Sequence, residues 1–197
     1  MHTLFIILLI ATSVVALTFI VERGLALRWQ RVIPPAVQHA VEFYKGADQL
    51  PQVQKACADH HSTAGRLLLF ATQHLDWSHS ECTKLIETRA RHEVAQLERG
   101  LVVLEILIGI APLLGLVGTI YGLITLFGSM SAVTGVDSVK FAQGISTALY
   151  ATLLGLLVAI PALVAWSYYS KKIEHLTVEL ETLCDDFLRR HYQDKAR

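Results

Sequence analysis

Three stretches of the sequence carry no charged side chain: Thr3–Val21, Ile106–Val136 and Phe141–Ser170. A bilayer core about 30 Å thick requires about 20 apolar residues when the chain is helical. The first stretch is just long enough, and the other two leave room for part of a connecting turn. The pattern therefore predicts an all-α membrane protein with three transmembrane helices, at residues 1–22, 101–128 and 143–170.

The first apolar stretch also has the length of a secretory signal peptide. Signal peptides begin with positive charge and end at a small-residue cleavage site. Here no Lys or Arg precedes the stretch, and Glu22 and Arg23 follow it. These features favour a span that is retained in the protein.

The basic residues that flank the predicted spans predict an orientation, because Lys and Arg gather on the cytoplasmic side. They follow span 1, precede span 2 and follow span 3: Arg23, Arg28, Arg31, Arg89, Arg91, Arg99, Lys171 and Lys172. The link at 129–142 offers only Asp137 and Lys140. We therefore expect the N-terminus and this link on the outer side of the membrane, and the loop 23–100 and the tail 171–197 in the cytoplasm.

Both long spans are predicted to continue into the cytoplasm as helices. Glu81 follows Ser78 at the spacing of a capping box, which marks a helix start. An apolar stripe at intervals of three and four then continues into span 2: Ile86, Ala90, Val94, Leu97, Leu101, Leu104 and Ile108. A similar stripe follows span 3: Ile173, Leu176, Leu180, Leu183 and Phe187. The two extensions predict a cytoplasmic helical bundle.

The loop 23–100 is too long for a simple turn. Pro34, Pro35 and Pro51 are expected to divide it, with one helix from the mid-30s to the mid-40s and another from about Thr63 to Leu75. On the helix that leads into span 2, the charged pairs Glu87–Arg91 and Arg89–Glu93 are spaced i,i+4 and are expected on its exposed side.

Composition agrees with a membrane protein, because 53% of residues are hydrophobic and only 17% are charged. The net charge is zero, so nucleic acid is not an expected partner. The three cysteines are expected to be reduced thiols. We expect no metal and no cofactor, because the spacings of the loop's Cys and His residues match no structural zinc pattern: Cys57, His60, His61, His74, His79, Cys82 and His92.

Small residues gather on one face of each long span, which favours close helix packing in lipid. In span 2 this face contains both small residues and residues with hydroxyl groups: Pro112, Gly115, Gly118, Thr119, Gly122, Thr125 and Ser129. In span 3 the face contains Gly144, Ala148, Thr152, Gly155, Ala159 and Ala162. Thr119 and Thr152 could form a weakly polar lining that holds water or a polar guest. Alternatively, each hydroxyl bonds only to its own helix backbone.

The middle of each span contains no Asp, Glu, Lys, Arg or His, and Glu105 lies near the cytoplasmic end of span 2. Proton relays usually need an ionisable group at membrane depth. If this chain takes part in proton conduction, another polypeptide must supply the titrating group.

Two ordered motifs carry a resemblance to a known family. The first is the run Ala111–Ile120 followed by Gly122. The second combines Gly144-Ile145, Ala148-Leu149, Ala151-Thr152, Gly155-Leu156 and Ala159-Ile160-Pro161-Ala162. Together they resemble the signatures of the MotA/TolQ/ExbB proton channels. The three-span layout is similar to the ExbB/TolQ branch and unlike four-span MotA.

The resemblance implies a homopentamer in the bacterial inner membrane, around a pair of single-span partners of the ExbD/TolR type. The partner supplies an Asp, and Thr119 and Thr152 correspond by position to pore threonines that face it. The expected function is a proton-channel subunit of an ion-driven motor, not an enzyme. A non-conducting scaffold of the same fold is the alternative. H⁺ or Na⁺ as the ion, and the process that is energised, remain open.

One position departs from the branch's pattern. Where the span-3 motif commonly carries Glu, this sequence has Thr147. We infer that the subunit has no second proton station in this span. Thr152 is five positions after Thr147, or about 140° further around the helix axis, so the two side chains are expected to point in different directions. The alternatives for Thr147 are a bond to its own backbone or a position beside the pathway.

Overall fold

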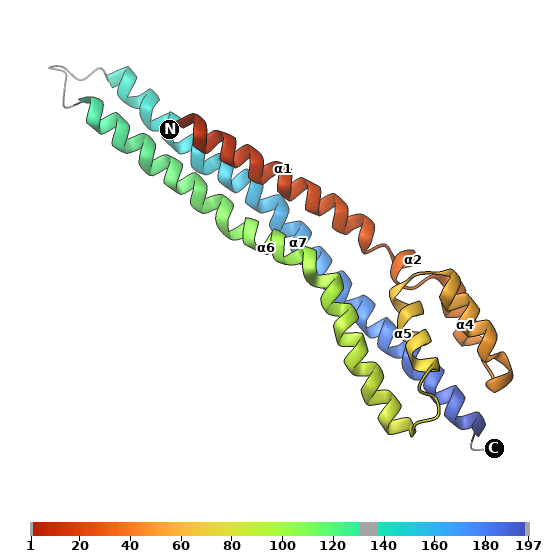
Figure 1. Ribbon diagram of the computed structural model, residues 1–197. Coiled ribbons are helices and arrows are strands. Elements are labelled where there is room, and N and C mark those ends of the chain that lie inside the picture. Colours follow the sequence, from red (N-terminus) through yellow and green to blue (C-terminus); the bar gives the residue numbers. More distant parts are fainter. Residues whose placement is uncertain (1, 131–137, 196–197) are drawn as a thin grey trace. The chain divides into compact units, whose positions relative to one another are not determined.

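The computed structural model describes the backbone of residues 2–130 and 138–195 (Figure 1). The described chain is helical and without strands, which confirms the predicted all-α class. Its elements are α1 (His2–Ala26), α2 (Trp29–Val32), α3 (Pro35–Glu42), the 3-10 helix η1 (Ala47–Gln49), α4 (Leu50–Asp59), α5 (Thr63–Thr72), α6 (His79–Met130) and α7 (Ser138–Lys195).

Three helices are long and apolar enough to cross a membrane: α1, α6 and α7. As predicted, α6 runs without interruption from the capping box into span 2, and α7 runs from span 3 into the tail. Both long helices extend into the predicted link 129–142, because α6 reaches Met130 and α7 begins at Ser138. Residues 131–137 lie outside the described part of the chain.

The chain divides into two compact units. The span unit comprises residues 1–23 and 100–168, and the loop unit comprises residues 24–99 and 169–197. Both long helices contribute to both units, since α6 crosses the boundary at residue 100 and α7 crosses it at residue 169.

In the span unit, α1 lies alongside α6 and α7 (Figure 1). Ala16 of α1, Leu107 of α6 and Ala162 of α7 form a small buried cluster. The rings of Phe5 and Tyr121 lie 5.8 Å apart, which adds a second contact between α1 and α6. Most large apolar side chains of this unit instead point outward, as expected of helices that lie in lipid.

The loop unit has a conventional buried core, in which the predicted tail stripe of α7 is confirmed. Leu176, Leu180 and Phe187 are each at most 1% exposed. The Phe187 ring lies 5.1 Å from that of Tyr44. The Tyr44 hydroxyl lies 2.7 Å from Nδ1 of His191, so the end of α7 is tied to the segment that follows α3.

Several local predictions hold in the loop unit, and one helix was missed. α3 and α5 occupy the two predicted positions. The capping box is formed: the Ser78 N–H donates to Glu81 Oε2 over 3.2 Å, and the Glu81 N–H donates to Ser78 Oγ over 3.4 Å. The unpredicted helix is α4. Pro51 lies in its first turn, where a proline needs no N–H partner, so this proline starts a helix as well as interrupting the loop.

The expectation that the Arg89–Glu93 pair lies on the exposed side of its helix is wrong for Glu93. Its side chain is 1% exposed. Arg66 of α5 approaches Glu93 Oε2 to 2.5 Å, and Arg89 approaches Oε1 to 3.1 Å. Glu93 is thus buried between two arginines, one of which belongs to a helix that covers this face of α6.

Candidate pore-lining site

Glycines allow α6 and α7 to approach each other closely within the span unit. A Cβ atom added to Gly115 would lie 2.7 Å from the carbonyl oxygen of Ala151 and 2.9 Å from Cα of Thr152. A Cβ atom added to Gly155 would lie 2.6 Å from the carbonyl oxygen of Ala111. Contacts this short are not tolerated by real Cβ atoms, so the helix spacing here depends on the absence of side chains.

The contact continues along both helices beyond this pair of glycines. A Cβ at Gly118 would meet Cβ of Ala151 at 2.9 Å, and one at Gly122 would meet Cβ of Ala148 at 2.9 Å. A Cβ at Gly144 would lie 2.5 Å from a methyl group of Leu126. Five of the glycines singled out in the sequence therefore lie at one continuous interface between α6 and α7: Gly115, Gly118, Gly122, Gly144 and Gly155.

Two hydroxyls meet inside this interface. Thr119 Oγ1 of α6 lies 2.5 Å from Thr152 Oγ1 of α7. Thr119 is buried and Thr152 is half-buried. We call these two side chains the hydroxyl pair. They come together because Gly115, one turn before Thr119, allows the backbone of α7 to approach at Thr152.

Backbone carbonyls surround the hydroxyl pair. Thr119 Oγ1 lies 3.1 Å from the Gly115 carbonyl oxygen and 3.0 Å from that of Ala148, and Thr152 Oγ1 lies 3.3 Å from the Gly115 oxygen. With the contact between the two hydroxyls, this makes four possible hydrogen bonds, and the two hydroxyl protons can form only two of them at once. Each hydroxyl also keeps acceptor capacity. The pair can therefore exchange donor and acceptor roles by rotating O–H bonds, without moving heavy atoms.

The structure does not bring every predicted site residue to the hydroxyl pair. Thr147 is exposed, and its hydroxyl donates to the carbonyl of Gln143 over 2.9 Å. Pro112 is half-buried inside α6, and Pro161 is exposed inside α7. The sequence marks Ala148 only by its small side chain, and that pattern does not indicate that the Ala148 carbonyl accepts a hydrogen bond from Thr119.

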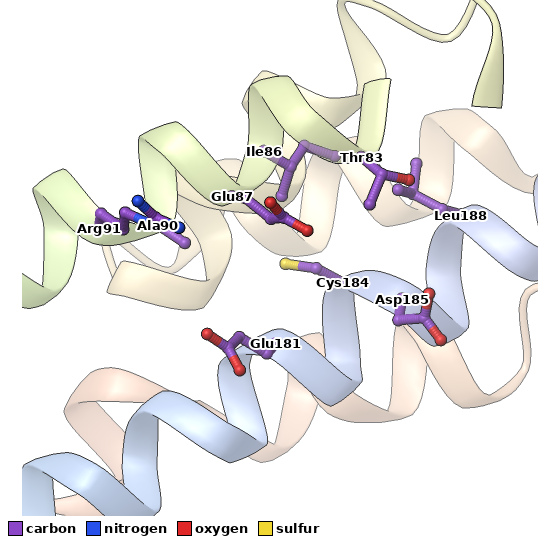
Figure 2. A pocket seen from close by; sticks show the side chains of 9 residues that line it. All are labelled: Thr83, Ile86, Glu87, Ala90, Arg91, Glu181, Cys184, Asp185 and Leu188. Atoms are coloured by element: carbon purple, nitrogen blue, oxygen red, sulfur yellow. The ribbon is translucent and has the colours of Figure 1, made fainter. Parts of the chain in front are cut away.

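The loop unit contains a second feature, a pocket of 390 Å³ between its parts of α6 and α7. Figure 2 shows Glu87 of α6 and Cys184 of α7 pointing into the gap, with Glu181 and Asp185 nearby on α7. Burial raises the pKa of the Cys184 thiol to about 12, so it is a poor nucleophile. Within the described residues, no group of three or more His, Cys, Asp or Glu side chains could hold a metal ion.

Comparisons with known proteins place the two helices in a family. The profile described as the MotA/TolQ/ExbB proton channel family matches residues 60–182, which include the whole hydroxyl-pair region. The chain belongs to the MotA/TolQ/ExbB family. The resemblance seen in the sequence motifs is thereby confirmed, and the protein is a multi-pass membrane protein.

Relatives of this MotA/TolQ/ExbB protein carry transport names. A Synechocystis protein named as an ExbB-like biopolymer transport protein is 33% identical over 80% of this chain, which spans 63% of that relative's length. TolQ of the Pseudomonas aeruginosa Tol-Pal system is 26% identical over 91% of this chain and 82% of its own length. The biopolymer transport protein ExbB of Helicobacter pylori is 38% identical over 41% of this chain and 56% of its own length.

Proposed function

We propose that this protein is a channel subunit, and not an enzyme, of an inner-membrane motor driven by an ion gradient, with H⁺ as the ion. The observation that carries the proposal is the hydroxyl pair Thr119–Thr152. It places two interchangeable donors and acceptors inside an otherwise apolar helix interface. Membership of a proton channel family supports this interpretation.

The chain needs a partner for this function. A hydroxyl can donate to a carboxylate and can accept from a carboxylic acid, so the hydroxyl pair suits a group that gains and loses a proton. The charge-free stretches Ile106–Val136 and Phe141–Ser170 supply no such group. We infer that an ExbD/TolR-like protein with one span supplies an Asp to the half-buried Thr152 side of the pair.

The proposed assembly is a homopentamer that encloses the partner's spans, with α6 and α7 at the centre and α1 at the periphery. The spans are residues 1–22, 101–128 and 143–170, the N-terminus is periplasmic, and 23–100 and 171–197 are cytoplasmic. One charge that crosses a potential of 100 mV releases about 2.3 kcal/mol. In this arrangement that free energy drives movement of the partner and energises transport or work on the envelope.

A non-conducting scaffold of the same fold is the second candidate function. The observation that favours it is that backbone carbonyls of Gly115 and Ala148 already lie within hydrogen-bonding distance of the hydroxyl pair. A pair that is satisfied in this way can join two helices without binding any external group.

Proton flux in liposomes separates the two functions. The full chain is reconstituted with the single-span protein that co-purifies with it, and flux is measured with an internal pH dye under an imposed potential. Thr119→Val and Thr152→Val keep the side-chain shape and remove the hydroxyl. We expect each to lower flux by about tenfold or more, while the complex keeps its subunit composition.

Thr147→Val is the matched control. It is the same substitution on the same helix as Thr152→Val, at an exposed hydroxyl that bonds its own backbone. We expect its flux to equal that of the wild type. Unchanged flux in the Thr119→Val/Thr152→Val double variant would refute the proposed role of the pair. Wild-type flux no higher than that of empty liposomes, with the complex intact, would favour the scaffold.

A further inference from the structure

A pocket of 500 Å³ lies in the loop unit, directly after α1. One wall comes from the last residue of α1 and the segment that follows it, and the other comes from the turn between α4 and α5. Its lining residues are Ala26, Gln30, Arg31, Pro34, His60, His61 and Ser62. The pocket thus joins two segments that are about 30 residues apart in the sequence.

The pocket presents hydrogen-bond donors and no carboxylate. Arg31 carries a permanent positive charge and five N–H donors, and each imidazole of His60 and His61 offers at least one N–H. Within the part of the chain that the structure describes, none of these three side chains has a hydrogen-bond or ion-pair partner. Ser62 is occupied locally, because its hydroxyl accepts from the Gly65 N–H over 3.0 Å.

The position of the pocket in the chain gives its relation to the bilayer. Ala26 is the last residue of the apolar segment Phe5–Ala26 that can cross a membrane. The pocket therefore begins about one helical turn after Glu22 and Arg23, the charged residues at the end of span 1, which places it near the depth of lipid headgroups. Trp29 follows Ala26 and is partly exposed at 37%, as is common for tryptophan at this depth.

We propose that this pocket binds the phosphate of an anionic phospholipid headgroup. The guanidinium of Arg31 is suited to two parallel bonds to phosphate oxygens, and the two histidines add donors from the opposite wall. Ala26 and Pro34 provide an apolar part of the lining, which suits the start of a lipid's glycerol and acyl region. A free phosphate ion offers the same oxygens, but the adjoining apolar segment favours the lipid.

Native mass spectrometry of the full chain, in the complex as purified in detergent, tests the proposal. The probes are phosphatidylglycerol and phosphatidylcholine with identical acyl chains, each titrated against wild type and an Arg31→Gln/His60→Gln/His61→Gln variant. We expect the wild type to prefer phosphatidylglycerol. We expect the triple variant to bind phosphatidylglycerol about tenfold more weakly, with no change in binding of phosphatidylcholine.

Two single variants make the test specific. Arg28→Gln removes the same charge from the same segment, but Arg28 does not line the pocket, so this variant should bind like the wild type. Arg31→Lys keeps the charge but loses the planar pair of N–H donors, so it should weaken binding of phosphatidylglycerol less than Arg31→Gln does. If circular dichroism shows that the triple variant does not fold, the comparison of Arg31→Lys with Arg31→Gln tests the proposal in its place.

Three results would overturn the proposal. The first is equal binding of phosphatidylglycerol by the wild type and the folded pocket variants. The second is an equal loss in Arg28→Gln, which would mean that diffuse positive charge attracts the lipid. The third is displacement of phosphatidylglycerol by excess inorganic phosphate, which would assign the pocket to the free ion.

Discussion

Adding a single methyl group at Gly115 tests the packing on which the hydroxyl pair depends. Gly115→Ala places a Cβ atom 2.7 Å from the Ala151 carbonyl oxygen and 2.9 Å from Cα of Thr152. Both contacting atoms are backbone atoms of α7, so no flexible side chain can move aside. The two helices must separate by several tenths of an ångström, which also stretches the contact between the two hydroxyls.

The steric cost of Gly115→Ala can be estimated by comparing it with Gly109→Ala on the same helix. Nothing lies within 4 Å of a Cβ added to Gly109. Replacing glycine with alanine in a helix gains about 0.5–1 kcal/mol, and this gain is common to Gly109→Ala and Gly115→Ala. The difference between the two variants is therefore the steric cost alone, about 1–3 kcal/mol for an overpacked interface. Gly128→Ala is a second control, because its Cβ also meets nothing.

Hydrogen–deuterium exchange measures this difference in steric cost at the interface between α6 and α7. Peptides from residues 143–157 of α7 have the same sequence in all these variants, so their exchange rates report only the change in packing. We expect exchange in Gly115→Ala to be roughly five-fold to 150-fold faster than in Gly109→Ala. Equal protection of these peptides in the two variants would refute the claim that Gly115 sets the approach of α6 and α7.

Three further predictions concern the loop unit. Glu93→Gln should lower the stability of the loop unit by about 1–2 kcal/mol, less than for a fully buried ion pair, because Arg66 and Arg89 are partly exposed and can regain water. Hydrogen–deuterium exchange of residues 63–72 measures this loss, and unchanged protection there would contradict the prediction. Burial raises the pKa of Cys57 from 9.0 to about 11, so below pH 9 its thiolate fraction should be roughly a hundredfold lower than that of an exposed thiol; iodoacetamide labelling at pH 8 should be correspondingly slow, and rapid labelling of the folded protein would refute this. Ser78→Ala should cost about 1 kcal/mol by removing the cap of α6, measured as faster exchange in residues 79–84, with Ser80→Ala as the control.

Much of the fold could be predicted from sequence because it depends on periodicity along single helices. The α7 stripe that ends at Phe187 is spaced to bury one face, and it is buried. The capping box at Ser78 is a local arrangement that needs no partner element, and it is formed. The long helices lack breakers in the parts that belong to the loop unit, and they continue across the predicted membrane boundary.

The features that sequence could not predict depend on which elements lie against each other. Glu93 has the spacing of a surface ion pair, and only the position of Arg66 on α5 makes it a buried one. The small residues of α6 and α7 indicated a packed interface but left its register open. The register determines that Thr119 meets Thr152, and it follows from which glycine lies opposite which carbonyl.

The cluster of Ala16, Leu107 and Ala162 has a consequence for synthesis of the protein. Its first member is made 146 residues before its last, as the residue numbers show. At about 5–20 residues per second, roughly 7–30 s pass between them. During that interval α1 must persist in lipid without its final neighbours. Its outward-facing side chains, such as Ile7 at 62% and Ile10 at 58% exposure, suit a helix that inserts alone and is joined by its partners afterwards.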